Sequence, residues 1–108
     1  MNNLLAVTLA VAAVTIAAPA MASMELAKKA RCVGCHAAEK KMVGPSFKDI
    51  GIRYKDQPGA QATLTEKVRH GGAGTWGAIP MSPNGPDKIA DADLQTLLSW
   101  ILDGAAID

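Results

Sequence analysis

The sequence predicts an all-α domain built from four helices, and three observations lead to this class. The chain has 108 residues, which is the length of one domain. Apolar residues within 94–102 follow the period of a helix, and no segment alternates apolar and polar residues as a half-buried strand does. Glycine and proline concentrate between the expected helices, with five Gly and three Pro in residues 71–88.

The first 22 residues have the composition of an export signal. Seventeen of them are apolar and none is charged, and the apolar stretch 4–18 is shorter than the ~20 residues that span a bilayer. A small-residue pattern follows at 20–22, so we expect cleavage between Ala22 and Ser23. The folded domain is then 23–108, in the periplasm and without stable membrane insertion. The alternative is an uncleaved membrane anchor.

Two short helices are expected in the first half of this domain. Ser23 is the expected N-cap of the first helix, and Glu25 in its first turn complements the helix dipole. The second helix is expected to start at Pro45, because proline is favoured at the first helical position. Its apolar side comprises Phe47, Ile50 and Tyr54.

Two longer helices are expected in the second half. One runs over about 60–70 and is ended by Gly71 and Gly72. The other has Asp91 as its expected cap and Gly104 at its end. Its apolar side follows the i, i+3, i+4, i+7, i+8 spacing through Leu94, Leu97, Leu98, Ile101 and Leu102.

Cys32, Cys35 and His36 form the motif Cys-x-x-Cys-His, which is the attachment sequence of c-type haem. Each thiol forms a thioether with one vinyl group on the same porphyrin edge, and the adjacent histidine becomes an axial iron ligand. His36 is expected to bind iron through Nε2, which leaves its Nδ1–H for a backbone carbonyl. We therefore expect one haem c, bound through Cys32 and Cys35, with the four helices around it.

Three other uses of these residue types compete with haem attachment. A thioredoxin-like redox pair also uses Cys-x-x-Cys, but that motif opens a helix in a βαβ unit and no strand is expected here. A zinc site could combine the three motif residues with His70, although the adjacent Cys35 and His36 fit poorly at one tetrahedral centre. A structural disulfide between Cys32 and Cys35 closes a very small loop and stabilises little.

Met81 is the expected second axial ligand. It lies 45 residues after His36, enough chain to reach the opposite haem face, and prolines at 80 and 83 restrict the backbone on both sides of it. A His/Met pair raises the reduction potential relative to two His ligands. With both axial positions filled the iron has no place for a substrate, so electron transfer is expected rather than catalysis. The other candidate ligands are Met24, Met42 and His70.

At these motifs the chain resembles the short bacterial class I cytochromes c of the cytochrome c-551 type, from Met24 to about Gly104. The shared landmarks are Cys32-x-x-Cys35-His36, Val43-Gly44-Pro45, Gly74-x-Trp76-Gly77, Ile79-Pro80-Met81-x-Pro83-Asn84 and the closing helix with Trp100. The resemblance implies a cytochrome c fold and a periplasmic electron carrier, with a reductase-type donor and an oxidase- or nitrite reductase-type acceptor. The alternative is a haem enzyme subunit or a small-molecule sensor with a displaceable sixth ligand.

The resemblance also implies a set of contacts around the haem. The carbonyl of Pro45 accepts the Nδ1–H of the axial histidine, and Asn84 lies near the sulfur of Met81. Trp76 donates its indole N–H to a haem propionate. Lys67 stands where the family often has Arg beside a propionate, and lysine offers a point charge instead of a bidentate contact.

Charge is distributed unevenly, although the formal net charge is only +1. Residues 24–56 carry eight basic and four acidic side chains, a net +4, and residues 57–108 carry three and six, a net −3. Neither half has the long single-sign run typical of a nucleic-acid-binding tail. The basic half contains the haem motif, so we expect it to orient an acidic redox partner.

Overall fold

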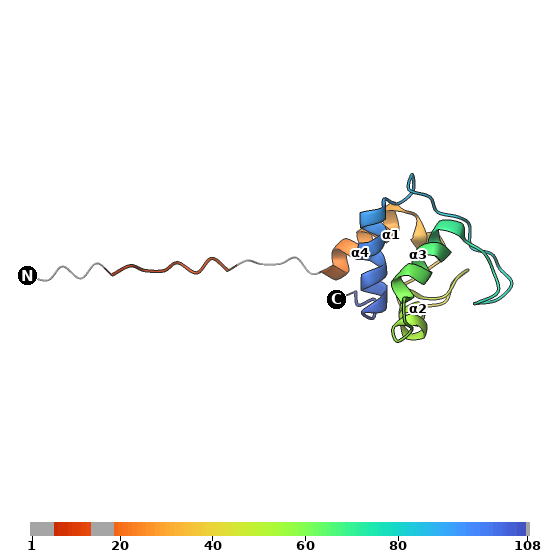
Figure 1. Cartoon of the computed structure of the whole chain (residues 1–108), viewed down its shortest axis with the longest axis horizontal. Coiled ribbons are helices and arrows are strands. Elements are labelled where there is room, and N and C mark those ends of the chain that lie inside the picture. Colours follow the sequence, from red (N-terminus) through yellow and green to blue (C-terminus); the bar gives the residue numbers. More distant parts are fainter. Residues whose placement is uncertain (1–5, 14–18, 108) are drawn as a thin grey trace, which may run out of the picture.

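The computed structural model describes residues 6–13 and 19–107, and the folded part is helical (Figure 1). Its elements are α1 Pro19–Lys29, the 3-10 turn η1 Cys32–Gly34, α2 Phe47–Tyr54, α3 Ala60–His70 and α4 Asp91–Leu102. The described residues contain no named strand, only an isolated bridge between Gly72 and Met81. The predicted all-α class with four helices is confirmed.

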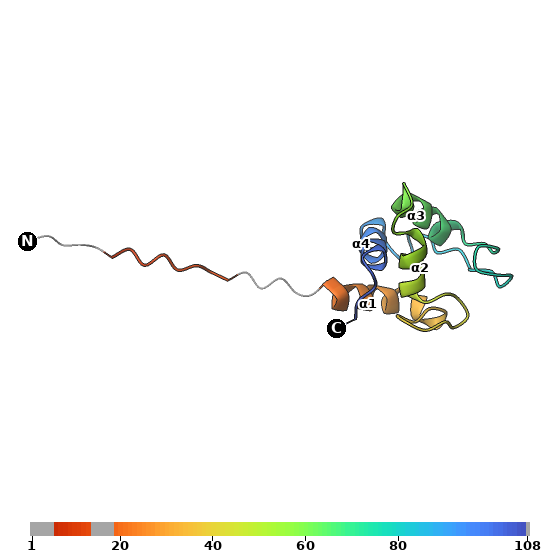
Figure 2. The ribbon, with the colours of Figure 1, turned by 90° about the horizontal axis from the view of Figure 1, so that it is seen from below.

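Helix α4 is the centre of the packing, and α1, α2 and α3 all contact it (Figure 1; Figure 2). Four residues of its predicted apolar side are at most 4% exposed, and the fifth, Leu102, is partly buried; the four are Leu94, Leu97, Leu98 and Ile101. Burying each of these side chains contributes about 1.5–3 kcal/mol. Helix α2 lies close against α4 at Gly51, where a Cβ would lie 2.2 Å from the carbonyl oxygen of Ile101. Only glycine permits this crossing.

Helix α1 begins at Pro19, earlier than predicted. Proline suits the first helical position and the next residues are good helix formers, so nothing in the sequence delays the helix until Ser23. The expected N-cap at Ser23 is therefore wrong, because this residue lies inside the helix and is fully buried. The helix also runs through the expected cleavage point after Ala22. Residues 1–5 and 14–18 of the expected signal lie outside the described residues.

Helix α2 begins at Phe47, two residues later than predicted. Its N-cap is Ser46, whose hydroxyl accepts a hydrogen bond from the backbone N–H of Asp49 at 3.0 Å. Pro45 therefore lies outside the helix, and the predicted helix start at this residue is wrong. Helix α3, in contrast, has the bounds that the sequence predicts.

Helix α4 starts at Asp91, but the N-cap is Ala90, so the predicted cap is wrong. The carboxylate of Asp91 pairs with Arg69 at the end of α3 instead of bonding to its own helix. The predicted end is confirmed, because Gly104 has φ 115° and donates its N–H to the carbonyl of Ile101 at 3.1 Å.

Candidate functional site

The Cys-x-x-Cys-His segment follows α1 and forms one tight turn. The turn begins at Arg31, whose φ of 64° is uncommon outside glycine. The N–H groups of Cys35 and His36 then both bond to the carbonyl of Cys32, at 3.1 and 2.9 Å. Both thiols are free, with Cys35 exposed and Cys32 partly buried. A single turn thus carries all three side chains, as attachment at one porphyrin edge requires.

The environment of the thiols does not favour the competing uses of the motif. Burial raises the pKa of the Cys32 thiol, a backbone hydrogen bond lowers it by less, and the neighbouring Cys35 adds to the rise. Catalytic Cys-x-x-Cys pairs depend on a lowered thiol pKa, so a redox pair fits poorly. In the part of the chain that the structure describes, no three His, Cys, Asp or Glu side chains gather as a zinc site needs.

His36 is held from two sides and is nearly buried. Its Nδ1 lies 2.7 Å from the carbonyl oxygen of Pro45, which is the contact that the resemblance implies. A carbonyl only accepts, so Nδ1 carries the proton and Nε2 keeps its lone pair for a metal. The ring stacks on Phe47 with centroids 5.5 Å apart, and Phe47 meets Trp100 of α4 edge-on at 5.6 Å. The imidazole is thereby tied to the core.

Gly44 is a site residue whose role the sequence did not reveal. A Cβ at this position would lie 2.5 Å from Cε1 and 2.9 Å from Nδ1 of His36. Real Cβ atoms do not approach other atoms so closely, and the histidine cannot move without losing its bond to Pro45. The landmark Val43-Gly44-Pro45 contains this residue, but only the fold shows that it packs on the imidazole.

Replacing Gly44 with alanine is expected to displace the His36 ring and to lower the free energy of unfolding of the holoprotein by about 1–3 kcal/mol. Denaturant unfolding measures this loss. Gly34→Ala is the matched control, because a Cβ there meets nothing within 4 Å and the position has no positive φ. Equal stabilities for the two variants would contradict the packing role of Gly44.

Met81 lies in the loop between α3 and α4, and its backbone is fixed against the end of α3. Its N–H bonds to the carbonyl of Gly72 at 2.9 Å, and its carbonyl accepts from the N–H of Gly72 at 3.0 Å. Gly71 makes this approach possible, since a Cβ there would lie 2.2 Å from the Met81 carbonyl oxygen. The loop therefore holds the Met81 backbone by paired hydrogen bonds as well as by flanking prolines.

The remaining predicted site residues lie on the same loop or beside it. Asn84 donates its side-chain N–H to the carbonyl of Ser82 at 2.9 Å, which keeps its amide close to the Met81 segment. Lys67 of α3 donates to the hydroxyl of Thr75 at 3.2 Å. Trp76 is 40% exposed. The predicted site residues thus fall into two groups, one around the motif turn and one on or beside the loop between α3 and α4.

The other candidate iron ligands are placed less suitably. Met24 packs against the hydrophobic core. Met42 is 44% exposed and lies close in sequence to the motif. His70 projects at the end of α3, where it contacts Glu66 at 3.0 Å on the surface. Met81 remains the favoured choice.

Arg69 is a second residue whose importance the sequence did not reveal. Its side chain is only 12% exposed and joins the loop to the start of α4. It donates to the carbonyl of Ile89 at 2.8 Å and to that of Asn84 at 3.2 Å, and it pairs with Asp91. The basic residues at the end of α3 look like ordinary partners of the helix dipole, so only the fold distinguishes Arg69.

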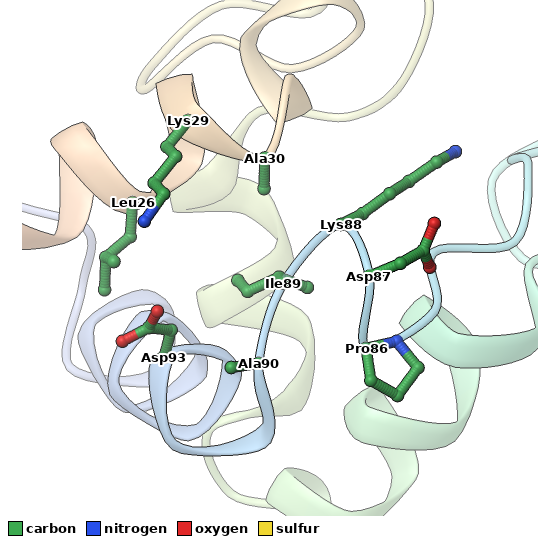
Figure 3. Close-up of a pocket in the computed structure, with 9 residues that line it drawn as sticks. All are labelled: Leu26, Lys29, Ala30, Pro86, Asp87, Lys88, Ile89, Ala90 and Asp93. Atoms are coloured by element: carbon green, nitrogen blue, oxygen red, sulfur yellow. The ribbon is translucent and has the colours of Figure 1, made fainter.

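A surface cavity of about 200 Å³ lies between α1 and the segment leading into α4 (Figure 3). It is lined by Leu26, Lys29, Ala30, Pro86, Asp87, Lys88, Ile89, Ala90 and Asp93. Its charges are of both signs, and none of its lining residues is a predicted site residue. The cavity is separate from the candidate haem site.

Comparisons with known proteins agree with the geometry. A family model described as cytochrome c matches residues 20–105. Cytochrome c-552 of Nitrosomonas europaea is 44% identical over 95 residues, which cover 88% of this chain and 90% of the relative. Cytochrome c-551 of Allochromatium vinosum is 42% identical over 94 residues, covering 87% and 98%. The crystal structure of wild-type Nitrosomonas europaea cytochrome c552 matches with a TM-score of 0.69 at 44% identity, over 75% of this chain and 98% of that chain.

Proposed function

Because this chain belongs to the cytochrome c family, we propose that it is a periplasmic electron carrier whose haem iron is bound by His36 and Met81. The family carries haem c covalently, and Cys32 and Cys35 have the spacing that attaches it. When bound, the haem iron takes up and releases one electron at a time. The relatives are small cytochromes c that act as electron carriers, which supports this role.

The hydrogen bond between His36 and the carbonyl of Pro45 is the observation that most directly supports His36 as an iron ligand. It fixes the proton on Nδ1, while Phe47 stacks on the ring and Gly44 packs close to its Cε1 atom. An imidazole confined in this way keeps its orientation in both oxidation states. On the loop, the paired hydrogen bonds of Met81 restrain the backbone that carries the sulfur. Two restrained ligands favour electron transfer, because little of the protein has to move when the charge of the iron changes.

The alternative function is a haem enzyme or sensor in which the sixth ligand leaves the iron. Absorption spectra of the purified holoprotein distinguish the two functions. A carrier with His36 and Met81 as ligands is expected to show the weak near-infrared band of a methionine–iron bond in the ferric state. The ferrous protein is expected not to bind carbon monoxide near neutral pH. Ready carbon monoxide binding would instead support the enzyme or sensor.

We place the mature protein in the periplasm, as residues 23–108 after removal of the signal at 1–22. The uncharged apolar segment supports export. The expected cleavage point between Ala22 and Ser23 lies within α1, so the signal is expected to be cleaved before this helix forms. Among the described residues, no helix has the length and apolar character needed to cross a bilayer.

The proposed partners are other redox proteins, a reductase-type donor and an oxidase- or nitrite reductase-type acceptor. Five exposed basic side chains surround the motif turn in sequence: Lys28, Lys29, Arg31, Lys40 and Lys41. They lie in the half of the chain with a net charge of +4. An acidic partner surface would be steered toward this face, and such electron-transfer contacts are small, weak and sensitive to salt.

A further inference from the structure

Two cations from different helices converge on Thr75, in the loop between α3 and α4. Arg53 of α2 donates Nη1 to the backbone carbonyl of Thr75 at 3.3 Å. Lys67 of α3 donates Nζ to the hydroxyl of the same residue at 3.2 Å. Both cationic groups therefore hydrogen-bond to the same residue and lie close together. Like charges that are this close repel each other.

Among the described residues, neither cation is paired with a carboxylate. Within residues 6–13 and 19–107 the salt bridges are Lys28–Glu25, Arg69–Asp91 and His70–Glu66. Arg53 and Lys67 belong to none of them, and the groups that they contact on Thr75 are uncharged. Two neighbouring cations without a counter-charge form a site that favours an anion.

The position of Arg53 is defined further by Trp76. Its guanidinium carbon lies 4.8 Å from the centroid of the Trp76 ring, which is a cation–π contact. Stacking and the bond to Thr75 together orient the planar guanidinium group, so less freedom is lost when it binds a carboxylate. Trp76 is the residue that we expect to meet a haem propionate. Arg53 therefore lies beside the expected position of the propionate. The sequence alone did not identify it as a propionate-binding residue.

We propose that Arg53 and Lys67 together bind one haem propionate, with Arg53 oriented by Trp76. This inference rests on the proposed position of the haem at Trp76 and goes beyond it. Lysine at position 67 supplies a point charge, and Arg53 supplies from α2 the planar donor group that a carboxylate binds through two oxygens. Arg53 is in this sense a cofactor-positioning residue contributed by a different helix.

A positive charge at the propionate favours the reduced haem, because it is repelled by the additional positive charge of ferric iron. In the holoprotein, Arg53→Gln is expected to lower the midpoint potential. It is also expected to raise the propionate pKa by about one pH unit, because an opposite charge nearby favours the ionised carboxylate. Potentiometric titration measures the first effect, and a pH titration followed by the haem resonances in NMR measures the second.

Two further variants separate this role from a structural one. Arg53→Lys keeps the charge and is expected to retain most of the wild-type potential and propionate pKa. Lys55→Gln removes an exposed cation two residues away and is expected to change both values much less than Arg53→Gln. The proposal is overturned if Arg53→Gln and Lys55→Gln have the same midpoint potential and the same propionate pKa. It is also overturned if Arg53→Lys changes these two values as much as Arg53→Gln does. A wild-type protein without the methionine–iron band would contradict the axial ligands instead, so the two failures are distinct.

Discussion

Replacing Met81 with alanine is expected to lower the reduction potential of the holoprotein by on the order of 0.1 V or more, within the ~0.8 V over which axial ligands set haem potentials. The thioether favours ferrous iron, and alanine has no atom that can bind the metal. The open position is also expected to admit carbon monoxide in the ferrous state. Potentiometry and the near-infrared spectrum measure both consequences in the same sample.

Met42→Ala is the control for this experiment. Met42 is 44% exposed and is held near the motif by the bond of its N–H to the carbonyl of Gly44 at 3.0 Å. Its variant is expected to keep the wild-type band and to remain inert to carbon monoxide. If Met81→Ala retained the wild-type spectrum, or if Met42→Ala lost it, the ligand assignment would be wrong.

Replacing Arg69 with methionine is expected to lower the free energy of unfolding of the holoprotein by about 2–3 kcal/mol, as loss of a largely buried charged donor does. The carbonyls of Ile89 and Asn84 lose their bonds, and Asp91 loses its partner. Methionine keeps much of the side-chain volume, so the loss reports on the polar contacts. Denaturant unfolding followed by circular dichroism measures the change.

His70→Gln is the matched control, because His70 follows Arg69 directly and forms an exposed pair with Glu66. Exposed pairs of this kind contribute little, and the expected change is within about 0.5 kcal/mol. The methionine–iron band of Arg69→Met is also expected to disappear at a lower denaturant concentration than that of the wild type. Equal unfolding curves for the two variants would show that Arg69 does not hold the loop.

The sequence predicts correctly those features that depend only on residues close together in the chain. The apolar side of α4 follows from its spacing alone, and the haem-attachment motif is evident from Cys32, Cys35 and His36. The ends of helices were less predictable. Asp91 has the chemistry of a cap, but it is the first residue inside α4 and its carboxylate pairs with Arg69. Pro45 suits a helix start, yet Ser46 makes the cap.

The residues that sequence reasoning missed act through contacts between distant positions. Gly44 has no unusual backbone angle, and its role is visible only because the ring of His36 lies against it. Arg53 lies 14 positions before Lys67, which the resemblance already identifies, and the two side chains meet at Thr75 in the loop between α3 and α4. No sequence periodicity indicates this contact between the two side chains, because the contact depends on how α2 and α3 pack around α4.

The paired hydrogen bonds of Met81 have a consequence for the order in which this molecule comes apart. The motif turn, Pro45 and Phe47 form one unit of chain anchored in the core, whereas Met81 belongs to a loop held by Arg69 and a few backbone bonds. Segments with few buried apolar contacts open at a lower free energy than the core does. The proposed ligands therefore belong to units of unequal local stability. Release of the methionine is therefore expected as a sub-global event, whereas loss of the histidine is expected only when the whole fold opens.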